Sequence, residues 1–169
     1  MKRTNHFILA GLIGLASGCA FKRQSVVLPP VGPPPLVLGS RSPEGGLTVY
    51  SALDLGTPGE PDNVYYHSGY KIYSLDGKMV KDVNNKVGPT YIEDPATVSL
   101  PPGRYNVVAR AAAFGTVSVP VVIEAGKTTS VHLDGSELTS GRQTSASDFV
   151  RLPDGLIIGW RAKENGEPK

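Results

Sequence analysis

The segment SLPPGRYNVVARAAAFGTVSVPVVIEAGKTTSVHL, residues 99–133, contains the clearest secondary-structure pattern in the chain. It holds three runs rich in β-forming residues, separated by short turns that contain glycine: 104–109, 116–124 and 128–133. Because successive side chains of a strand point to opposite faces, Tyr105, Val107 and Ala109 share one face. The segment therefore predicts consecutive strands with one apolar face. Pro120 cannot donate to a β-ladder, so we expect its strand to lie at a sheet edge or to contain a bulge.

Short β-type runs also precede this segment. Residues 47–53 are rich in β-formers, and residues 70–75 and 78–83 flank Asp76-Gly77, a dipeptide typical of tight hairpin turns. After the first eighteen residues, no window of twelve or more has the apolar stripe of a helix. We therefore expect an all-β fold, a small antiparallel β-sandwich.

Residues 99–133, together with GYKIYSLDGKMVKDV at 69–83, resemble the carboxypeptidase regulatory-like modules of the PEGA type. The shared pattern is an apolar residue, Pro-Gly, an aromatic residue, an alternating strand, a glycine turn and a last Val-x-Leu strand. The resemblance covers residues 47–133. It implies a transthyretin-like sandwich of about seven strands and no catalytic residues. Residues 134–169 lie outside it, and we expect a hairpin there around Pro153-Asp154-Gly155.

The N-terminus has the three parts of a secretory signal. Lys2 and Arg3 give a positive start, the apolar run FILAGLIGL follows, and small residues precede Cys19, the only cysteine of the chain. The apolar run is too short to cross a bilayer as a helix. Leu-Ala-Ser-Gly-Cys at 15–19 resembles the lipobox of bacterial lipoproteins, with Ala at 16 where that family more often has a branched aliphatic residue. The resemblance implies that residues 1–18 are a signal peptide and that Cys19 is acylated.

The alternative is an ordinary secretion signal with a free or buried thiol. A single cysteine in an exported chain cannot form an internal disulfide, and lipidation resolves that difficulty. Two or more acyl chains would hold the protein firmly on a membrane. Ala20 is not the acidic residue that retains enteric lipoproteins at the inner membrane, so that family's sorting rule favours the outer membrane of the cell envelope.

Residues 19–46 are expected to be the lipidated N-terminus and a proline-rich linker. The segment 25–46 contains six prolines and four glycines, a composition typical of a semi-rigid polyproline spacer. It could instead be a docking ligand for an aromatic groove. A third possibility is that residues 26–28 or 36–38 pack back on the domain, because both are too apolar for an ideal linker.

The charge of the chain indicates no nucleic-acid partner. Seventeen Lys and Arg stand against fifteen Asp and Glu, and loss of Lys2 and Arg3 with the signal leaves fifteen of each. A net charge near zero gives no basic surface of the kind that nucleic acids require.

The candidate binding residues are aromatic. Tyr65, Tyr66 and Tyr70 follow a polar, turn-rich insertion and could bind sugar or peptide, or could instead cap the core. Trp160, the only tryptophan, could seal the sandwich or present a partner site.

No residue spacing indicates catalysis, a metal or a cofactor. His67 and His132 match no catalytic or metal motif, and His132 is expected to face solvent from its strand. Residues 82–93 match an EF-hand loop only in part, because Lys86 and Val87 occupy places that need a ligand and a glycine. We therefore expect a non-enzymatic envelope lipoprotein, anchored through Cys19, whose sandwich binds a protein or a cell-wall polysaccharide. The alternatives are a purely structural spacer and an unrecognised hydrolase.

Replacing Cys19 tests the lipoprotein assignment. Cys19→Ser substitutes a hydroxyl for the thiolate nucleophile, so the lipid transferase should not modify it and unprocessed precursor should accumulate. Mass spectrometry of the wild-type protein should find an N-terminal Cys19 peptide heavier by its acyl groups. An unmodified thiol, or a mature N-terminus elsewhere, would contradict the assignment.

Overall fold

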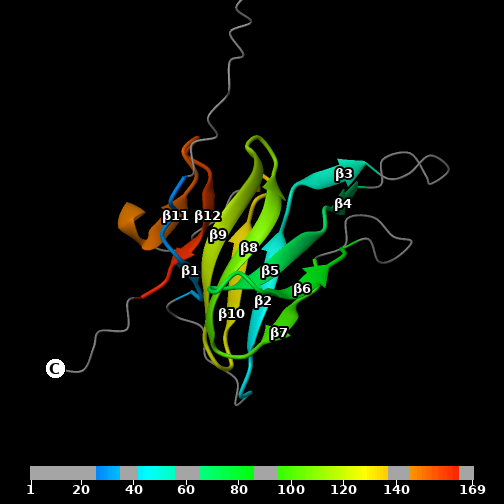
Figure 1. Ribbon diagram of the computed structural model, residues 1–169. Coiled ribbons are helices and arrows are strands. Elements are labelled where there is room, and N and C mark those ends of the chain that lie inside the picture. The colour runs from blue at the N-terminus through cyan, green and yellow to red at the C-terminus, as the bar shows by residue number, and fades with distance from the viewer. Residues whose placement is uncertain (1–25, 35–41, 56–64, 86–94, 137–144, 164–169) are drawn as a thin grey trace, which may run out of the picture.

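The computed structural model describes residues 26–34, 42–55, 65–85, 95–136 and 145–163 (Figure 1). Within these ranges the chain forms strands, one short 3₁₀ helix and no α-helix. An all-β fold is therefore confirmed. The elements are β1 (Val31–Gly32), β2 (Gly45–Tyr50), β3 (Leu53–Leu55), β4 (Tyr65–His67), β5 (Tyr70–Ser74), β6 (Met79–Val83), β7 (Val98–Leu100), β8 (Gly103–Ala111), β9 (Gly115–Ile123), β10 (Thr128–His132), η1 (Ala146–Asp148), β11 (Phe149–Arg151) and β12 (Ile157–Arg161).

The largest sheet has seven strands in the order β11-β12-β1-β9-β8-β5-β6. Its centre is the long antiparallel pair β8–β9, which the alternating sequence of residues 104–124 predicts. β5 and β6 form the predicted hairpin, and Gly77 in its turn has φ +83°, a value that glycine adopts without steric cost.

Two smaller sheets complete the fold. One has three strands in the order β10-β2-β7, and the other is the pair β3–β4, which projects from the body as an arm (Figure 1). β10 runs parallel to β2, and β1 runs parallel to β9. The expectation of a purely antiparallel arrangement is therefore wrong. Short hairpin turns predict only antiparallel neighbours, whereas these two parallel pairs join segments that are distant in sequence.

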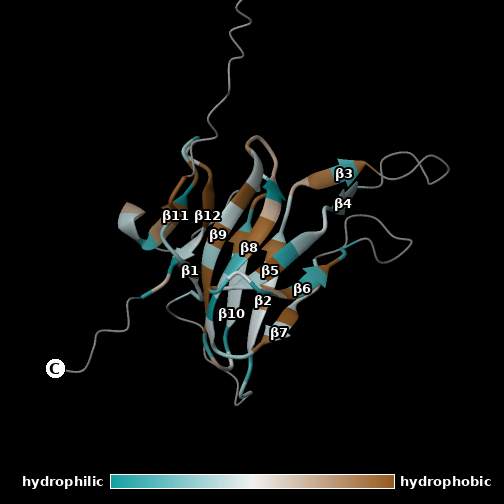
Figure 2. Cartoon of the chain, viewed as in Figure 1, coloured by the Kyte–Doolittle hydropathy of each residue, from teal (hydrophilic) through white to brown (hydrophobic). Residues whose placement is uncertain are grey.

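Both larger sheets contribute to one buried cluster. Val49 and Val131 of the three-stranded sheet and Val107 and Val119 of the seven-stranded sheet are fully buried in it. Along β9 the buried positions alternate with more exposed ones, as Figure 2 shows by its alternation of brown and pale segments. Period-two burial is what strands with one apolar face require.

The proline-rich segment differs from the predicted spacer. β1 lies inside the seven-stranded sheet, where Val31 pairs with Arg161 of β12 on one side and with Val121 of β9 on the other. Val31 is fully buried, and Leu28 joins the core cluster. The spacer interpretation is wrong for residues 28–33, because burial of these apolar side chains favours packing over a solvated polyproline chain.

Residues 149–161 also belong to the main sheet rather than to a separate extension. β11 and β12 form an antiparallel hairpin whose turn contains Gly155 at φ +95°. Val150 and Ile158 are fully buried in the common core. The folded unit therefore extends beyond the predicted limits, residues 47–133, at both ends.

Pro120 lies in neither an edge strand nor a bulge. The β8–β9 register runs without a break through the pair Asn106–Pro120, and β1 covers the other side of β9. β1 pairs with β9 at Val121 alone, so the strand accommodates a residue without an N–H.

Gly159 of β12 has no side chain, which lets β12 and β1 pack close to β10 of the three-stranded sheet. A Cβ placed at Gly159 would lie 2.5 Å from Val31 Cγ1 and 2.9 Å from the Ser130 carbonyl oxygen of β10. Gly159→Ala should therefore lower the free energy of unfolding by about 1–3 kcal/mol, as overpacked cores do. Gly103→Ala is the matched control, because its nearest neighbour would be 3.6 Å away, and it should change stability by about 0.5 kcal/mol or less. Urea denaturation measures both, and equal stabilities would contradict the predicted close contact.

Candidate functional site

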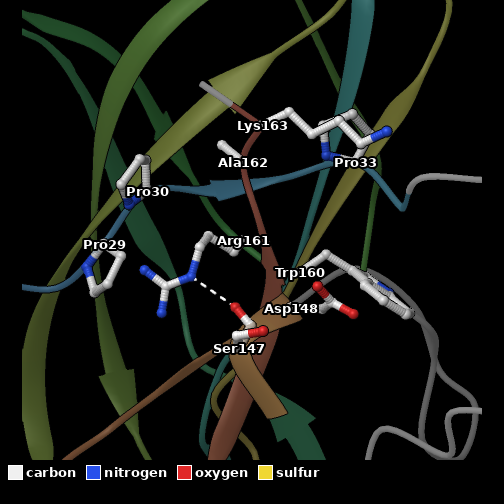
Figure 3. A pocket seen from close by; sticks show the side chains of 9 residues that line it. All are labelled: Pro29, Pro30, Pro33, Ser147, Asp148, Trp160, Arg161, Ala162 and Lys163. Carbon is white, nitrogen blue, oxygen red and sulfur yellow. Dashed lines mark hydrogen bonds between the residues drawn. The ribbon is translucent and has the colours of Figure 1, made fainter. Parts of the chain in front are cut away.

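A groove lies where the N-terminal segment crosses the C-terminal hairpin (Figure 3). Its volume is about 710 Å³. It is lined by Pro29, Pro30, Pro33, Ser147, Asp148, Trp160, Arg161, Ala162 and Lys163. In the view of Figure 3, Pro29 and Pro30 lie on one side, Trp160 and Asp148 on the other, and Arg161 between them. The groove is large enough for part of an extended peptide or a few sugar rings.

Trp160 is held by contacts on two sides. Its backbone pairs with Gly32 of β1 and with Phe149 of β11. Its indole packs on the ring of Phe149, with centroids 4.5 Å apart and an interplanar angle of 41°. The indole is partly exposed, so it both closes the core at this corner and offers an aromatic face to the groove.

Arg161 fixes the short helix η1 against β12. Its Nε donates to the Ser147 carbonyl at 2.9 Å, and one of its terminal nitrogens donates to the Phe149 carbonyl at 3.5 Å. The Arg161 side chain thus holds η1 in place at the groove, and it also places a positive charge there. Lys163 is exposed and adds a second cation.

Asp148 has a structural partner. Its carboxylate accepts from the Ser145 backbone N–H at 3.0 Å, and the Ser145 hydroxyl accepts from the Ser147 N–H, which together make a capping box. The carboxylate is thereby fixed at the start of η1. The groove thus combines an aromatic face, proline rings and two cations, which suits binding through apolar and charged contacts.

The three candidate tyrosines have different environments. Tyr65 and Tyr66 lie on β4 in the projecting arm, where Tyr65 is exposed and Tyr66 half-buried. Tyr70 is buried on β5, so its proposed place on a binding surface is wrong. Tyr70 pairs with Val83 and shares a face with buried Ile72, and this alternation turns the phenol into the core. The structure does not bring any of these tyrosines into the groove of Trp160.

The two histidines of the described segments flank Tyr50. His132 stacks on the Tyr50 ring at 4.3 Å, and His67 meets it edge-on at 5.7 Å. His67 is buried, and its Nδ1 lies 2.7 Å from the Ser51 carbonyl, so this nitrogen is a donor. His132 is half-buried rather than solvent-facing, and burial lowers its pKa while Asp134 partly opposes the shift. Both rings therefore serve the packing of this end of the fold.

Several expected features lie outside the described residues. They include the signal peptide, Cys19 and most of the partial EF-hand match, residues 86–93. In the part of the chain that the structure describes, no cluster of three or more His, Cys, Asp or Glu is placed to hold a metal. The same part contains no helix long and apolar enough to span a bilayer.

Sequence reasoning identified only Trp160 among the groove residues. The linker interpretation covers Pro29, Pro30 and Pro33, and Arg161 and Lys163 belong to no motif. The alternative that residues 26–28 pack on the domain is right for Leu28, which is buried, whereas Val26 and Val27 are exposed; residues 36–38 lie outside the described residues.

Comparison with known proteins gives no relative. No protein-family model, no curated protein and no solved structure matches the chain. The geometry and the sequence are therefore the basis for its function.

The environment of Tyr70 predicts an unusual stability profile. Burial raises the pKa of Tyr70 to about 12, and among the described residues its hydroxyl has no hydrogen-bond partner. A buried, unpaired hydroxyl is destabilising, so Tyr70→Phe should raise the free energy of unfolding at pH 7 by about 1 kcal/mol.

The same pKa shift gives the dependence on pH. A phenol in the unfolded chain titrates near pH 10, whereas the folded state keeps the proton to about pH 12, so stability falls as pH rises through this window. The Phe variant has no phenol to ionise, so it should not lose this stability. The difference in free energy of unfolding between Tyr70→Phe and wild type should therefore grow above pH 10. Urea denaturation at pH 7 and at alkaline pH measures the free energy of unfolding of both proteins. A less stable Phe variant would show that the hydroxyl has a partner.

Proposed function

We propose that this protein is a lipid-anchored protein of the bacterial cell envelope whose non-catalytic β-sandwich binds a partner through the groove at Trp160. The observation that carries the binding function is this groove, in which a partly exposed indole, three proline rings and two cations surround about 710 Å³. Tryptophan and arginine are enriched among the residues that contribute most to binding at interfaces.

The anchor is proposed from the N-terminal sequence. A positive start, an apolar run, small residues and the single Cys19 fit lipoprotein processing better than a free exported thiol. Ala20 favours sorting to the outer membrane. The proposed partner is an envelope protein or a wall polysaccharide, held close to the membrane that carries the lipid.

The sandwich itself is the finer fold proposal. The shared core of the seven-stranded and three-stranded sheets supports two packed layers of the transthyretin-like kind. The resemblance of residues 69–83 and 99–133 to carboxypeptidase regulatory-like modules supports the same arrangement. Such modules accompany other activities rather than performing catalysis, and a fold of this kind does not define a function by itself.

The groove favours binding over hydrolysis. Asp148 is its acidic side chain, and that carboxylate already caps η1. A hydrolytic site would need a nucleophile or an activated water beside a general base. Ser147 offers a hydroxyl, but this hydroxyl donates to Ser145 Oγ at 2.8 Å, and the described residues that line the groove include no histidine or second carboxylate to activate it.

Substitution in the groove tests the proposed function. Two assays would compare wild type with Trp160→Ala and Lys163→Glu. The first measures capture of envelope proteins from detergent-solubilised membranes, and the second measures sedimentation with purified wall polymer. Both variants should lose most of the bound partner, because one removes the aromatic face and the other reverses an exposed charge. Lys163→Glu is the cleaner change, because Lys163 is exposed and lies outside the core.

Tyr65→Ala is the matched control, since Tyr65 is exposed on the arm and does not line the groove. It should bind like wild type. Equal binding by all four proteins would exclude the groove. A wild-type protein that captures nothing in stoichiometric amount would favour the spacer, and release of cleaved wall fragments would favour a hydrolase.

A further inference from the structure

Among the described residues, one end of the fold carries most of the exposed large apolar side chains. Val27 is 93% exposed and Leu55 is 69% exposed, while Val26, Leu53, Tyr65 and Phe114 are 37–39% exposed. We call this surface the β8–β9 end, because the β8–β9 turn that contains Phe114 lies at its centre. We propose that the β8–β9 end rests on the anionic lipid surface of the membrane to which Cys19 is attached; this rests on the proposed lipid anchor.

The parts of the β8–β9 end are fixed to one another. The Ala52 N–H donates to the Arg110 carbonyl at 2.8 Å, and the Arg110 guanidinium donates to the Leu53 carbonyl and forms an ion pair with Asp54. These bonds hold the β3–β4 arm beside the last residues of β8, directly before the turn. Figure 1 shows the arm and this turn at the same end, and Figure 2 shows β3 in brown with one teal segment between. The ion pair also neutralises Asp54, which would otherwise oppose approach to anionic lipid.

The N-terminal segment reaches the domain from the same end. β1 runs parallel to β9, with Val31 opposite Val121, so the residues before β1 lead back towards Gly115, where β9 begins. Val26 and Val27 precede β1 by only a few residues, and Leu28 is buried in the core. The chain from Cys19 therefore joins the domain near the β8–β9 turn.

The distance to the lipid is short. Val26 follows Cys19 by seven positions, and a fully extended chain of that length spans at most about 25 Å. Lys22 and Arg23 lie within this segment, and juxtamembrane cations are attracted to anionic headgroups. A short tether gives the attached surface a high effective concentration at the bilayer, so weak apolar contacts suffice to hold it there.

The far end of the fold has a different surface. At the β9–β10 turn, Lys127 and Glu124 form an ion pair with 2.7 Å between Nζ and Oε2, and Ala125 is exposed beside them. β9 separates this turn from Phe114 by about 30 Å, since a strand rises roughly 3.3 Å per residue. Other exposed apolar side chains, Leu75, Met79 and Val80, lie on the β5–β6 hairpin among Asp76, Lys78 and Lys81. Charged side chains separate the apolar ones on this hairpin, so its surface favours contact with water over contact with lipid.

Single-cysteine labelling tests the proposed orientation. Acylation blocks the thiol of Cys19, so Phe114→Cys, Leu55→Cys and Ala125→Cys each offer one reactive thiol to an environment-sensitive nitrobenzoxadiazole dye. The lipidated full-length proteins would be reconstituted in vesicles of phosphatidylethanolamine and phosphatidylglycerol. The dyes at positions 114 and 55 should shift to the blue and be quenched several-fold more by nitroxide lipids than the dye at 125. Dyes that are equally accessible to an aqueous quencher at all three positions would overturn the proposal.

Two controls separate this proposal from the anchor itself. Wild-type protein should take up no dye; uptake would mean that Cys19 carries a free thiol, which would overturn the lipid anchor and, with it, this proposal. With the anchor intact, Leu55→Asp combined with Phe114→Cys should reduce lipid quenching at position 114 while the protein stays on the vesicles. Unchanged quenching in that variant would show that the apolar surface does not hold the domain to lipid, and would overturn the proposal.

Discussion

The architecture depends on the insertion of Val31 between β9 and β12. β1 is the single strand that links the C-terminal hairpin β11–β12 to the rest of the seven-stranded sheet. The Pro30 carbonyl accepts from the Ala162 N–H at 2.8 Å, which extends the contact beyond the two residues of the strand. Pro30 and Pro33 on either side lack N–H groups, so β1 cannot lengthen into a regular ladder. Because β1 stays this short, the packing of the fully buried Val31 side chain helps to hold it in the sheet, in addition to its hydrogen bonds.

This constraint explains how the groove forms. The segment that supplies Val31 also supplies Pro29, Pro30 and Pro33 to the groove, while β12 supplies Trp160 and Arg161. The two ends of the folded chain thus meet in one place, and neither would form the groove alone. Trp160 pairs with Gly32, a position where an added Cβ would lie 2.8 Å from the Ala162 Cα. A glycine is therefore needed for the close crossing that shapes the site.

The sequence pattern of neighbouring residues predicts the individual strands better than it predicts how distant strands pair. The alternation in residues 104–124 and the Asp76-Gly77 turn specify β8, β9 and the β5–β6 hairpin, because hairpin pairing depends on neighbouring residues. The parallel pair of β10 with β2 and the placement of β1 depend on segments that are distant in sequence, and periodicity carries no information about such pairings. Tyr70 could have been assigned to the core, because it precedes Ile72 by two residues on the same strand. The groove cannot be predicted from the sequence, because its residues come from two segments, 29–33 and 147–163, that are distant in the chain and share no pattern.

The early burial of the N-terminal segment also changes the expected distance between the domain and its proposed anchor. A spacer over residues 25–46 would have let the domain stand well away from the lipid, whereas Leu28 is already part of the core. Pro29, the first groove residue, follows Cys19 by ten positions and so lies within about 35 Å of the proposed acyl attachment along the chain. With the proposed anchor, a partner of the groove would lie close to that membrane surface. This geometry suits a polymer or protein lying near the membrane better than a diffusing target in the middle of a wide compartment.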